Sequence, residues 1–188
     1  VVNSFEFYLG VNIRNIYILL LLSLSYSQPS NFSYNSTTIV AMYFFELVII
    51  DDIPITSEDW VGAFNGEVCV GATMWDTSLC NQGICGVAVM GDDGMEHSEG
   101  YMQTGDIPSF KIYDSSQNVY YNAIPSENIP WQSNAMNIID SLTVFRDCLG
   151  ELGGMAYEDS CGICDDNPEN DCPFDCHGVP GGEAFIDD

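Results

Sequence analysis

The chain has 188 residues, of which 46% are hydrophobic, enough for one domain with a packed core and a small appendage. Its 28 acidic residues against three basic ones give a formal net charge of −25. Nucleic acid is excluded as an expected partner because phosphate binding needs a Lys/Arg surface, and direct binding to an anionic membrane is disfavoured for the same reason. The remaining partner classes are another protein, a glycan or a second copy of the chain.

The first unit along the chain has the features of a signal peptide. Arg14 precedes an apolar run at residues 16–24, and the small residues Ser25 and Ser27 follow, which is the order of a basic region, an apolar region and a cleavage site. The alternative is a membrane anchor, but a spanning helix needs roughly 20 apolar residues, more than this run supplies. We therefore expect residues 12–27 to direct export, with residues 1–11 as an upstream or fragment edge.

Residues 28–146 predict an all-β domain. Short runs rich in β-branched and aromatic residues alternate with turn residues, and no long stretch carries a helical apolar period. Seven strands over this length predict a two-layer antiparallel β-sandwich, either immunoglobulin-like or of jelly-roll type. The expected strands span residues 38–50, 60–64, 68–75, 86–90, 109–113, 119–123 and 138–145.

The run at residues 41–50 is almost continuously apolar. This pattern predicts a central strand that is buried on both faces. A long apolar strand near a mature N-terminus is also what a fibre subunit donates to the sheet edge of its neighbour. Pairing within its own domain is the more general behaviour of a strand, and we expect it here.

After Arg146 the composition changes abruptly, and the last 42 residues hold twelve acidic residues, no Lys or Arg and five of the eight cysteines. The pattern D-C-x-G-x-x-G-G-x-A-(Y/F)-x-D at residues 147–159 recurs at residues 175–187, so the period is 28 residues. Self-similarity at a fixed period indicates a tandem array. We therefore expect a disulfide-rich, irregular segment: a first cysteine-rich acidic repeat at residues 147–174 and a truncated second repeat at residues 175–188.

The cysteines of an exported protein are expected to form disulfides rather than zinc thiolates. Cys80 and Cys85 have a spacing that suits a closed loop, which leaves Cys69 as a buried free thiol. A 28-residue unit with few large apolar side chains depends on disulfides for its stability, and four cysteines allow three pairings. The four cysteines of the first repeat are Cys148, Cys161, Cys164 and Cys172.

Two acidic clusters are candidate Ca²⁺ sites, because this hard cation takes carboxylate and carbonyl oxygens as ligands. Neither has the twelve-residue spacing of an EF-hand loop. The alternative is that the carboxylates keep a linker extended and a loop solvated. The candidate ligands are Asp159, Asp165, Asp166 and Asp171 in the repeat, and Asp92, Asp93 and Glu96 in a glycine-flanked loop of the β domain.

No catalytic motif stands out. The two histidines, His97 and His177, belong to different segments, and the chain holds no HExxH or GxSxG pattern. Aromatic residues permit a carbohydrate-binding interpretation, although most are expected to be core. Trp131 follows Pro130 between turn signals, and it is the aromatic residue that we predict to be exposed and to bind a ligand.

Three segments resemble known extracellular sequences. The segment DWVGAFNGEVCVG at 59–71 resembles the IGAF-x-x-G-x-C-x-G hairpin of bacterial extracellular modules associated with outer-membrane sorting, and GDIPSFKIYD at 105–114 resembles their ITFKVYD strand. CGICDDNPENDC at 161–172 is similar to the CGVCGGD element of secreted metalloproteases with thrombospondin motifs and to the DCxGxxGGxAxxDxCGxC repeats of large surface proteins of marine bacteria. The resemblance of residues 59–71 and 105–114 implies a secreted or cell-surface β-sandwich and does not imply an enzyme.

The sequence therefore favours a non-catalytic structural or adhesion module of a larger secreted or cell-surface protein, bound to another extracellular protein, to a glycan or to itself. The alternatives are a carbohydrate-binding accessory module of an exoprotein and a fibre subunit assembled by strand donation.

Overall fold

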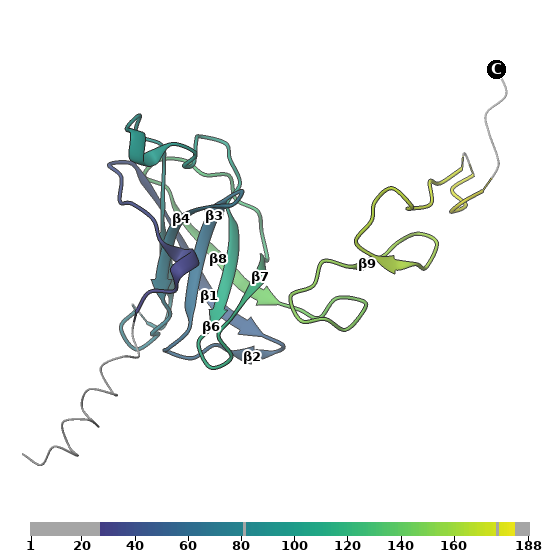
Figure 1. The fold of residues 1–188 in the computed structure, drawn as a ribbon, viewed down its shortest axis with the longest axis horizontal. Coiled ribbons are helices and arrows are strands. Elements are labelled where there is room, and N and C mark those ends of the chain that lie inside the picture. The colour runs from purple at the N-terminus through teal and green to yellow at the C-terminus, as the bar shows by residue number, and fades with distance from the viewer. Residues whose placement is uncertain (1–26, 81, 176, 183–188) are drawn as a thin grey trace, which may run out of the picture.

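The computed structural model describes residues 27–80, 82–175 and 177–182 and is shown in Figure 1. These residues form ten strands and two short 3-10 turns, without an α-helix. The predicted signal peptide lies outside the described residues except for Ser27, as do Cys176 and residues 183–188 of the second repeat. Within the described part of the chain, no helix has the length and apolar character needed to cross a membrane.

Eight strands form a β-sandwich, a curled sheet whose two halves face each other. The strand order is β2-β1-β8-β7-β6-β3-β4, and β5 pairs with β1. β7 connects the two layers, because it pairs with β6 over five positions and with β8 over only two. One layer contains β1 (Val40–Ile50), β2 (Ile53–Pro54), β5 (Cys85–Met90) and β8 (Met136–Val144); the other contains β3 (Trp60–Asn65), β4 (Val68–Met74), β6 (Ser109–Asp114) and β7 (Val119–Pro125).

The predicted all-β fold is confirmed, and all seven expected strands are present with ends within two residues of those expected. The pairing differs from the prediction in one respect. β1 and β8 run parallel over eight paired positions, so the sheet is mixed rather than purely antiparallel. The parallel pair is feasible because the long connection between the first and last strands of the sandwich leaves their relative direction free.

β1 is central, as predicted, because β8 pairs along one side of it and β5 and β2 pair along the other. It is not buried on both faces. Tyr43 and Phe45 point inward and are at most 1% exposed, whereas Leu47 is 45% exposed and Phe44 is half-buried. The expectation of two buried faces was wrong because no second layer of described residues covers the outer face of β1.

The core between the layers is built around aromatic side chains. The Phe45 ring packs edge-on against Phe110 at 5.1 Å, and Tyr43 lies 5.8 Å from the same ring. The Tyr43 hydroxyl donates a hydrogen bond to the carbonyl of Ile129 at 3.0 Å. Burial raises the pKa of Tyr43 to about 12, so this donor stays protonated throughout the neutral range.

β4 and β5 approach each other closely at the side of the sandwich opposite β7. A Cβ atom at Gly71 would lie 2.0 Å from the carbonyl oxygen of Ala88, which is backbone and has no room to move. The Thr73 hydroxyl donates to the carbonyl of Gly86 at 3.2 Å. Glycine at position 71 therefore allows the two layers to meet along this side.

A second, smaller core lies on the outer face of β3. The N-terminal 3-10 turn η1 (Ser30–Phe32), purple in Figure 1, places the fully buried Phe32 ring where a side chain at Gly62 would otherwise stand. Phe64 and Cys69 complete this cluster. Cys69 is 7% exposed and not disulfide-bonded, as predicted, and burial raises the pKa of its thiol.

The turn between β6 and β7 is organised by Asp114, which is 8% exposed. Its carboxylate accepts hydrogen bonds from the backbone N–H groups of Ser116 and Gln117 and from both of their side chains. Burial alone would raise the pKa of Asp114, but these donors outweigh it and lower the pKa.

We expect Asp114→Asn to lower the free energy of unfolding by about 1–2 kcal/mol at pH 7, because the charged acceptor is lost from a mostly buried turn. The pKa of Asp114 is lowered from 3.8 in the native state. Its stabilisation is therefore complete well above pH 3.8 and is lost as the pH falls through the native pKa. Urea unfolding measured from pH 7 down to pH 2.5 should show the free energies of unfolding of the wild type and of Asp114→Asn converging. A difference between them that stays constant with pH would contradict this account.

Candidate functional site

After β8 the chain leaves the sandwich as an irregular arm, whose described residues form two short strands, β9 (Tyr157–Glu158) and β10 (Cys164–Asp165) (Figure 1). Two disulfides join segments of the arm. They link the first of the four cysteines of the first repeat to the third and the second to the fourth, which is one of the three pairings left open by the sequence. The bonds are Cys148–Cys164 and Cys161–Cys172, and the head contains the predicted Cys80–Cys85 bond.

The arm begins with a five-residue loop closed by an aspartate. The Asp147 carboxylate accepts the backbone N–H groups of Leu149 at 3.0 Å and Glu151 at 2.8 Å. The Asp147 N–H donates to the Glu151 carbonyl, and its carbonyl accepts the Gly150 N–H, each at 2.9 Å. Gly150 has φ +83°, a left-handed conformation that favours glycine. The sequence D-x-x-G-x therefore specifies this loop, which we call the DxxG loop.

The DxxG loop occurs three times in the described part of the arm. At Asp159 the carboxylate accepts two backbone N–H groups at 2.8 Å, and at Asp175 it accepts two at 2.9 Å. The loop starts at positions 147, 159 and 175, so the first 28-residue repeat contains two DxxG loops and the third copy opens the second repeat. The 28-residue self-similarity of the sequence revealed the repeat but not the inner copy of the loop at Asp159, although the D-x-x-G spacing is visible in the sequence.

The glycine pair of the repeat has a structural reason in both copies. A Cβ atom at Gly154 would lie 2.0 Å from the Asp147 carboxylate, and one at Gly182 would lie 2.1 Å from the Asp175 carboxylate. The chain therefore packs directly against the aspartate that closes each loop.

Three of the four predicted metal ligands of the repeat gather near Tyr157. The Tyr157 hydroxyl donates to Asp171, and this bond, with burial and the nearby charges of Asp171, Asp165 and Asp159, raises the pKa of Tyr157 to about 12. The donors Asn170 and Asn167 lower the pKa of Asp165.

Two carboxylate oxygens in this group lack a donor. Oδ2 of Asp159 and Oδ1 of Asp171 are buried and have no hydrogen-bond partner in the structure. The fourth predicted ligand, Asp166, is exposed. The group therefore offers two oxygens with unused acceptor capacity.

The predicted metal ligands of the head are held by protein donors. Asp92 accepts the Gly94 N–H at 2.9 Å, and Asp93 accepts the Thr38 N–H at 3.1 Å. The buried Ser98 hydroxyl lies within hydrogen-bond distance of both carboxylates. The Thr38 N–H is the main reason that the pKa of Asp93 is lowered. Glu96, the third predicted ligand, is exposed.

Among residues 27–80, 82–175 and 177–182, no group of three or more His, Cys, Asp or Glu side chains is arranged to hold a metal ion.

The arm is attached to the head by a salt bridge and a partly buried leucine. The Arg146 guanidinium contacts the Asp51 carboxylate in the β1–β2 turn at 2.8 Å and donates to the Gly150 carbonyl of the first DxxG loop at 3.1 Å. Leu152 packs against the core of the sandwich, and the Gly153 N–H donates to the Phe145 carbonyl at 2.8 Å. These contacts fix the first DxxG loop against the end of the sandwich.

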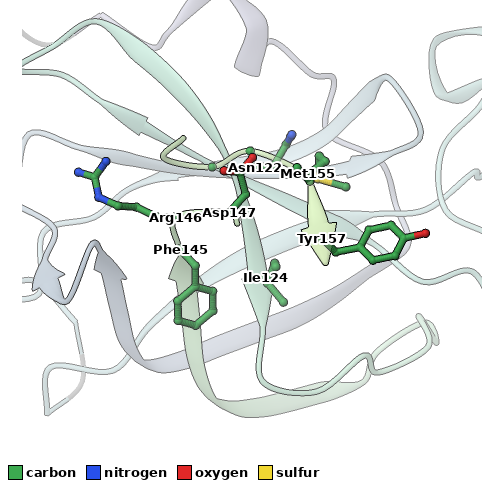
Figure 2. A pocket seen from close by; sticks show the side chains of 10 residues that line it. Asn122, Ile124, Phe145, Arg146, Asp147, Met155 and Tyr157 are labelled. Carbon is green, nitrogen blue, oxygen red and sulfur yellow. The ribbon is translucent and has the colours of Figure 1, made fainter. Parts of the chain in front are cut away.

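A hollow of about 280 Å³ lies where the head meets the arm (Figure 2). In this view Ile124 of β7 lies between Phe145 and Tyr157, with Met155 above them. Ile124, Phe145 and Met155 are each more than half exposed. The hollow is wide enough for an apolar side chain, but its lining does not select a particular ligand.

The prediction that Trp131 is an exposed ligand-binding residue was wrong. Trp131 is 2% exposed, and its indole N–H donates to the Val89 carbonyl at 3.0 Å. Its ring fills the space beside Gly91, where a Cβ atom would lie 2.4 Å away. The loop folds back onto the sandwich because the Trp131 N–H donates to the Asp106 carbonyl at 2.7 Å.

Partly exposed aromatic residues lie instead on the outer face of the other layer. Trp60, Tyr113 and Tyr120 are neighbours across β3, β6 and β7, and we call them the aromatic row. The rings of Tyr113 and Tyr120 are 4.8 Å apart. Beside the row, Lys111 Nζ lies 4.8 Å from the centre of the Phe64 ring, at a hollow of about 390 Å³. The aromatic row cannot be recognised in the linear sequence and becomes apparent only from the register of the three strands.

The chain matches no protein-family model, no curated protein and no solved structure.

Proposed function

We propose that the chain is a non-catalytic structural or adhesion module of a larger extracellular protein, in which the β-sandwich is a binding head and residues 147–182 are a spacer arm. The observation that carries this proposal is the DxxG loop, which occurs three times among the described residues and whose first two copies are held by crossed disulfides. A unit of this kind keeps its shape without a large apolar core. Three disulfides also suit an oxidising extracellular compartment, which agrees with the predicted signal peptide.

Small-angle X-ray scattering of the chain from residue 28 onward tests the spacer role. With its disulfides intact, the protein is expected to show one well-defined maximum dimension, because the arm is attached through Arg146 and Leu152 and stapled beyond them. Mild reduction should broaden the distribution of interatomic distances while the head keeps its circular dichroism spectrum. An oxidised protein that already scatters as a head with a random-coil tail would contradict the proposal.

The aromatic row supports a second candidate function, carbohydrate binding. Side-by-side aromatic rings on a sheet face offer apolar surfaces against which sugar rings can stack, and Lys111 and Asn31 add polar groups beside them. Affinity electrophoresis in gels that contain neutral polysaccharides is the direct test. Trp60→Ala should abolish retardation without changing the melting temperature by more than a few degrees. An unretarded wild-type protein would refute this candidate.

We also propose that the repeat binds Ca²⁺, with Asp159 and Asp171 as its first ligands. The support is their two buried carboxylate oxygens without donors, since unpaired buried acceptors are costly and a hard cation would satisfy them together with water and backbone carbonyls.

Isothermal titration calorimetry is expected to give a dissociation constant of about 10⁻⁴–10⁻³ M, the range of extracellular calcium modules. Asp171→Asn should weaken binding at least about tenfold, because it removes one charged ligand. Asp52→Asn, at an exposed carboxylate outside both candidate sites, is the matched control and should leave binding unchanged. No heat of binding, together with a melting temperature unaffected by EDTA, would refute the calcium proposal.

A further inference from the structure

The outer face of β1 and β8 carries an apolar groove. Met136 is 74% exposed and Ile138 is 62% exposed, although both belong to a strand at the centre of the sheet. Together with Phe44, Gln82 and Ile84 they line a groove of about 240 Å³. Contiguous exposed apolar side chains of this kind mark interaction sites more often than isolated ones. We call this feature the β1/β8 groove.

The fold holds the β1/β8 groove in shape. Parallel pairing sets Met42 beside Met136 and Phe44 beside Ile138, so apolar side chains stand in two rows on one face. The Phe44 ring lies over Gly86 of β5, where a Cβ atom would be 2.6 Å away. The groove is therefore built by strands of the sheet rather than by a mobile loop.

The rim of the groove is closed by a disulfide. Cys80 and Cys85 are bonded, and the short loop between them carries Gln82 and Ile84 to the groove. Gln82 has φ +55°, a left-handed conformation that few non-glycine residues adopt. A preformed site of this kind loses little conformational entropy when it binds a partner.

One end of the groove is acidic. Glu46 lies two residues beyond Phe44, and Asp140 lies two residues beyond Ile138. Because side chains alternate along a strand, both carboxylates project from the outer face that carries Phe44 and Ile138. They are neighbours across the ladder, between the pairs Phe45–Ile139 and Leu47–Ser141. Both are exposed, and neither makes a hydrogen bond or ion pair with another described residue. Like charges that face each other across strands are destabilising, and a cation placed between them would relieve the repulsion.

We propose that the β1/β8 groove binds a segment of a partner protein in which apolar side chains are followed by Lys or Arg. This proposal rests on the head being the binding part of the module. The apolar rows would bury the partner's apolar side chains, and Glu46 and Asp140 would pair with its cation. A second copy of the chain is a poor occupant, because each copy carries a net charge of −25 and two acidic surfaces repel each other.

The test uses three synthetic decapeptides and the chain from residue 28 onward, with fluorescence anisotropy at near-physiological salt. The probe is a block of Leu followed by a block of Lys, and the comparison peptides replace either the Lys block by Glu or the Leu block by Ser. The groove variants are Ile138→Ser and the double variant Glu46→Gln/Asp140→Asn. The matched controls are Ile107→Ser, at another residue more than half exposed, and Asp52→Asn/Glu58→Gln, at two exposed carboxylates.

The Leu/Lys peptide is expected to bind and the other two to bind at least about tenfold more weakly, because each lacks one of the two matching features. Ile138→Ser should weaken binding about tenfold, since burying an isoleucine contributes about 1.5 kcal/mol or more. The double charge variant should weaken it severalfold, and both controls should leave it unchanged within about twofold.

Equal weakening by the control and groove charge variants would overturn the proposal, because it would show general attraction to an acidic protein. Absence of Leu/Lys binding would overturn it as well. A concentration-dependent dimer in sedimentation that Ile138→Ser dissolves would replace it with self-association. None of these outcomes depends on the scattering experiment on the arm, so failure of the groove and failure of the spacer role can be told apart.

Discussion

Trp131→Ala is expected to destabilise the head by about 3–5 kcal/mol, as is typical when a large buried aromatic side chain is removed. The ring is 2% exposed and fills space that Gly91 leaves open for it. Its N–H also satisfies the carbonyl of Val89 at 3.0 Å, and that buried carbonyl would be left without a partner. Urea unfolding followed by circular dichroism measures the loss.

Trp131→Phe separates packing from hydrogen bonding. Phenylalanine keeps most of the apolar volume but has no N–H, so we expect a loss of about 1–3 kcal/mol, smaller than that of the alanine variant. Tyr157→Phe on the arm is a control that should leave unfolding of the head unchanged. If Trp131→Ala has the same urea unfolding midpoint as the wild type, the side chain is not part of the core, and the result would support an exposed, ligand-binding Trp131 instead.

Replacing Cys148 and Cys164 together by serine is expected to destabilise the arm by about 3 kcal/mol, the amount that a bond closing a loop of about 15 residues contributes in the chain-entropy description. The sequence separation of the two cysteines is 16 residues. The arm has little else to hold it, because large side chains such as Ile163 and Phe174 are about half exposed or more. We expect the amides of Leu149 and Glu151 to lose protection from hydrogen exchange.

The matched control for the arm is Cys80→Ser/Cys85→Ser, which removes the disulfide of the head. This double variant should change exchange only in the short loop at the β1/β8 groove and leave the arm protected. Unchanged protection of Leu149 and Glu151 in the Cys148→Ser/Cys164→Ser variant would show that the DxxG loop is stable without its disulfide.

The sequence predicted the strands well because their signals are local. Runs such as Ser109–Asp114 carry β-branched and aromatic residues between turns, and the hairpin at Gly66, with φ +58°, needs only two adjacent residues to specify it. Strand direction has no such local signal. An apolar run reads the same in either orientation, so the parallel pairing of β1 with β8 emerged only in the assembled sheet.

The candidate sites were harder to predict because they depend on contacts between distant residues. Arg146 and Asp51 are 95 positions apart, and neither residue stands out alone. Trp131 follows a proline in a loop, which resembles an exposed position until the hydrogen bond to Asp106 folds the loop inward. The carboxylates of Asp92 and Asp93 are oriented by hydrogen bonds from Ser98 and from the distant Thr38, which the sequence does not reveal, and calcium binding at this loop stays a prediction.

The crossed disulfides of the arm determine how it transmits mechanical tension. A force applied between Cys148 and Cys172 passes through the first bond to Cys164, along residues 161–164, and through the second bond from Cys161 to Cys172. The rest of the chain between these cysteines lies outside that path and carries no load. An arm of such repeats would therefore behave as a nearly inextensible tether: it can bend between units, but it cannot lengthen until a covalent bond is reduced.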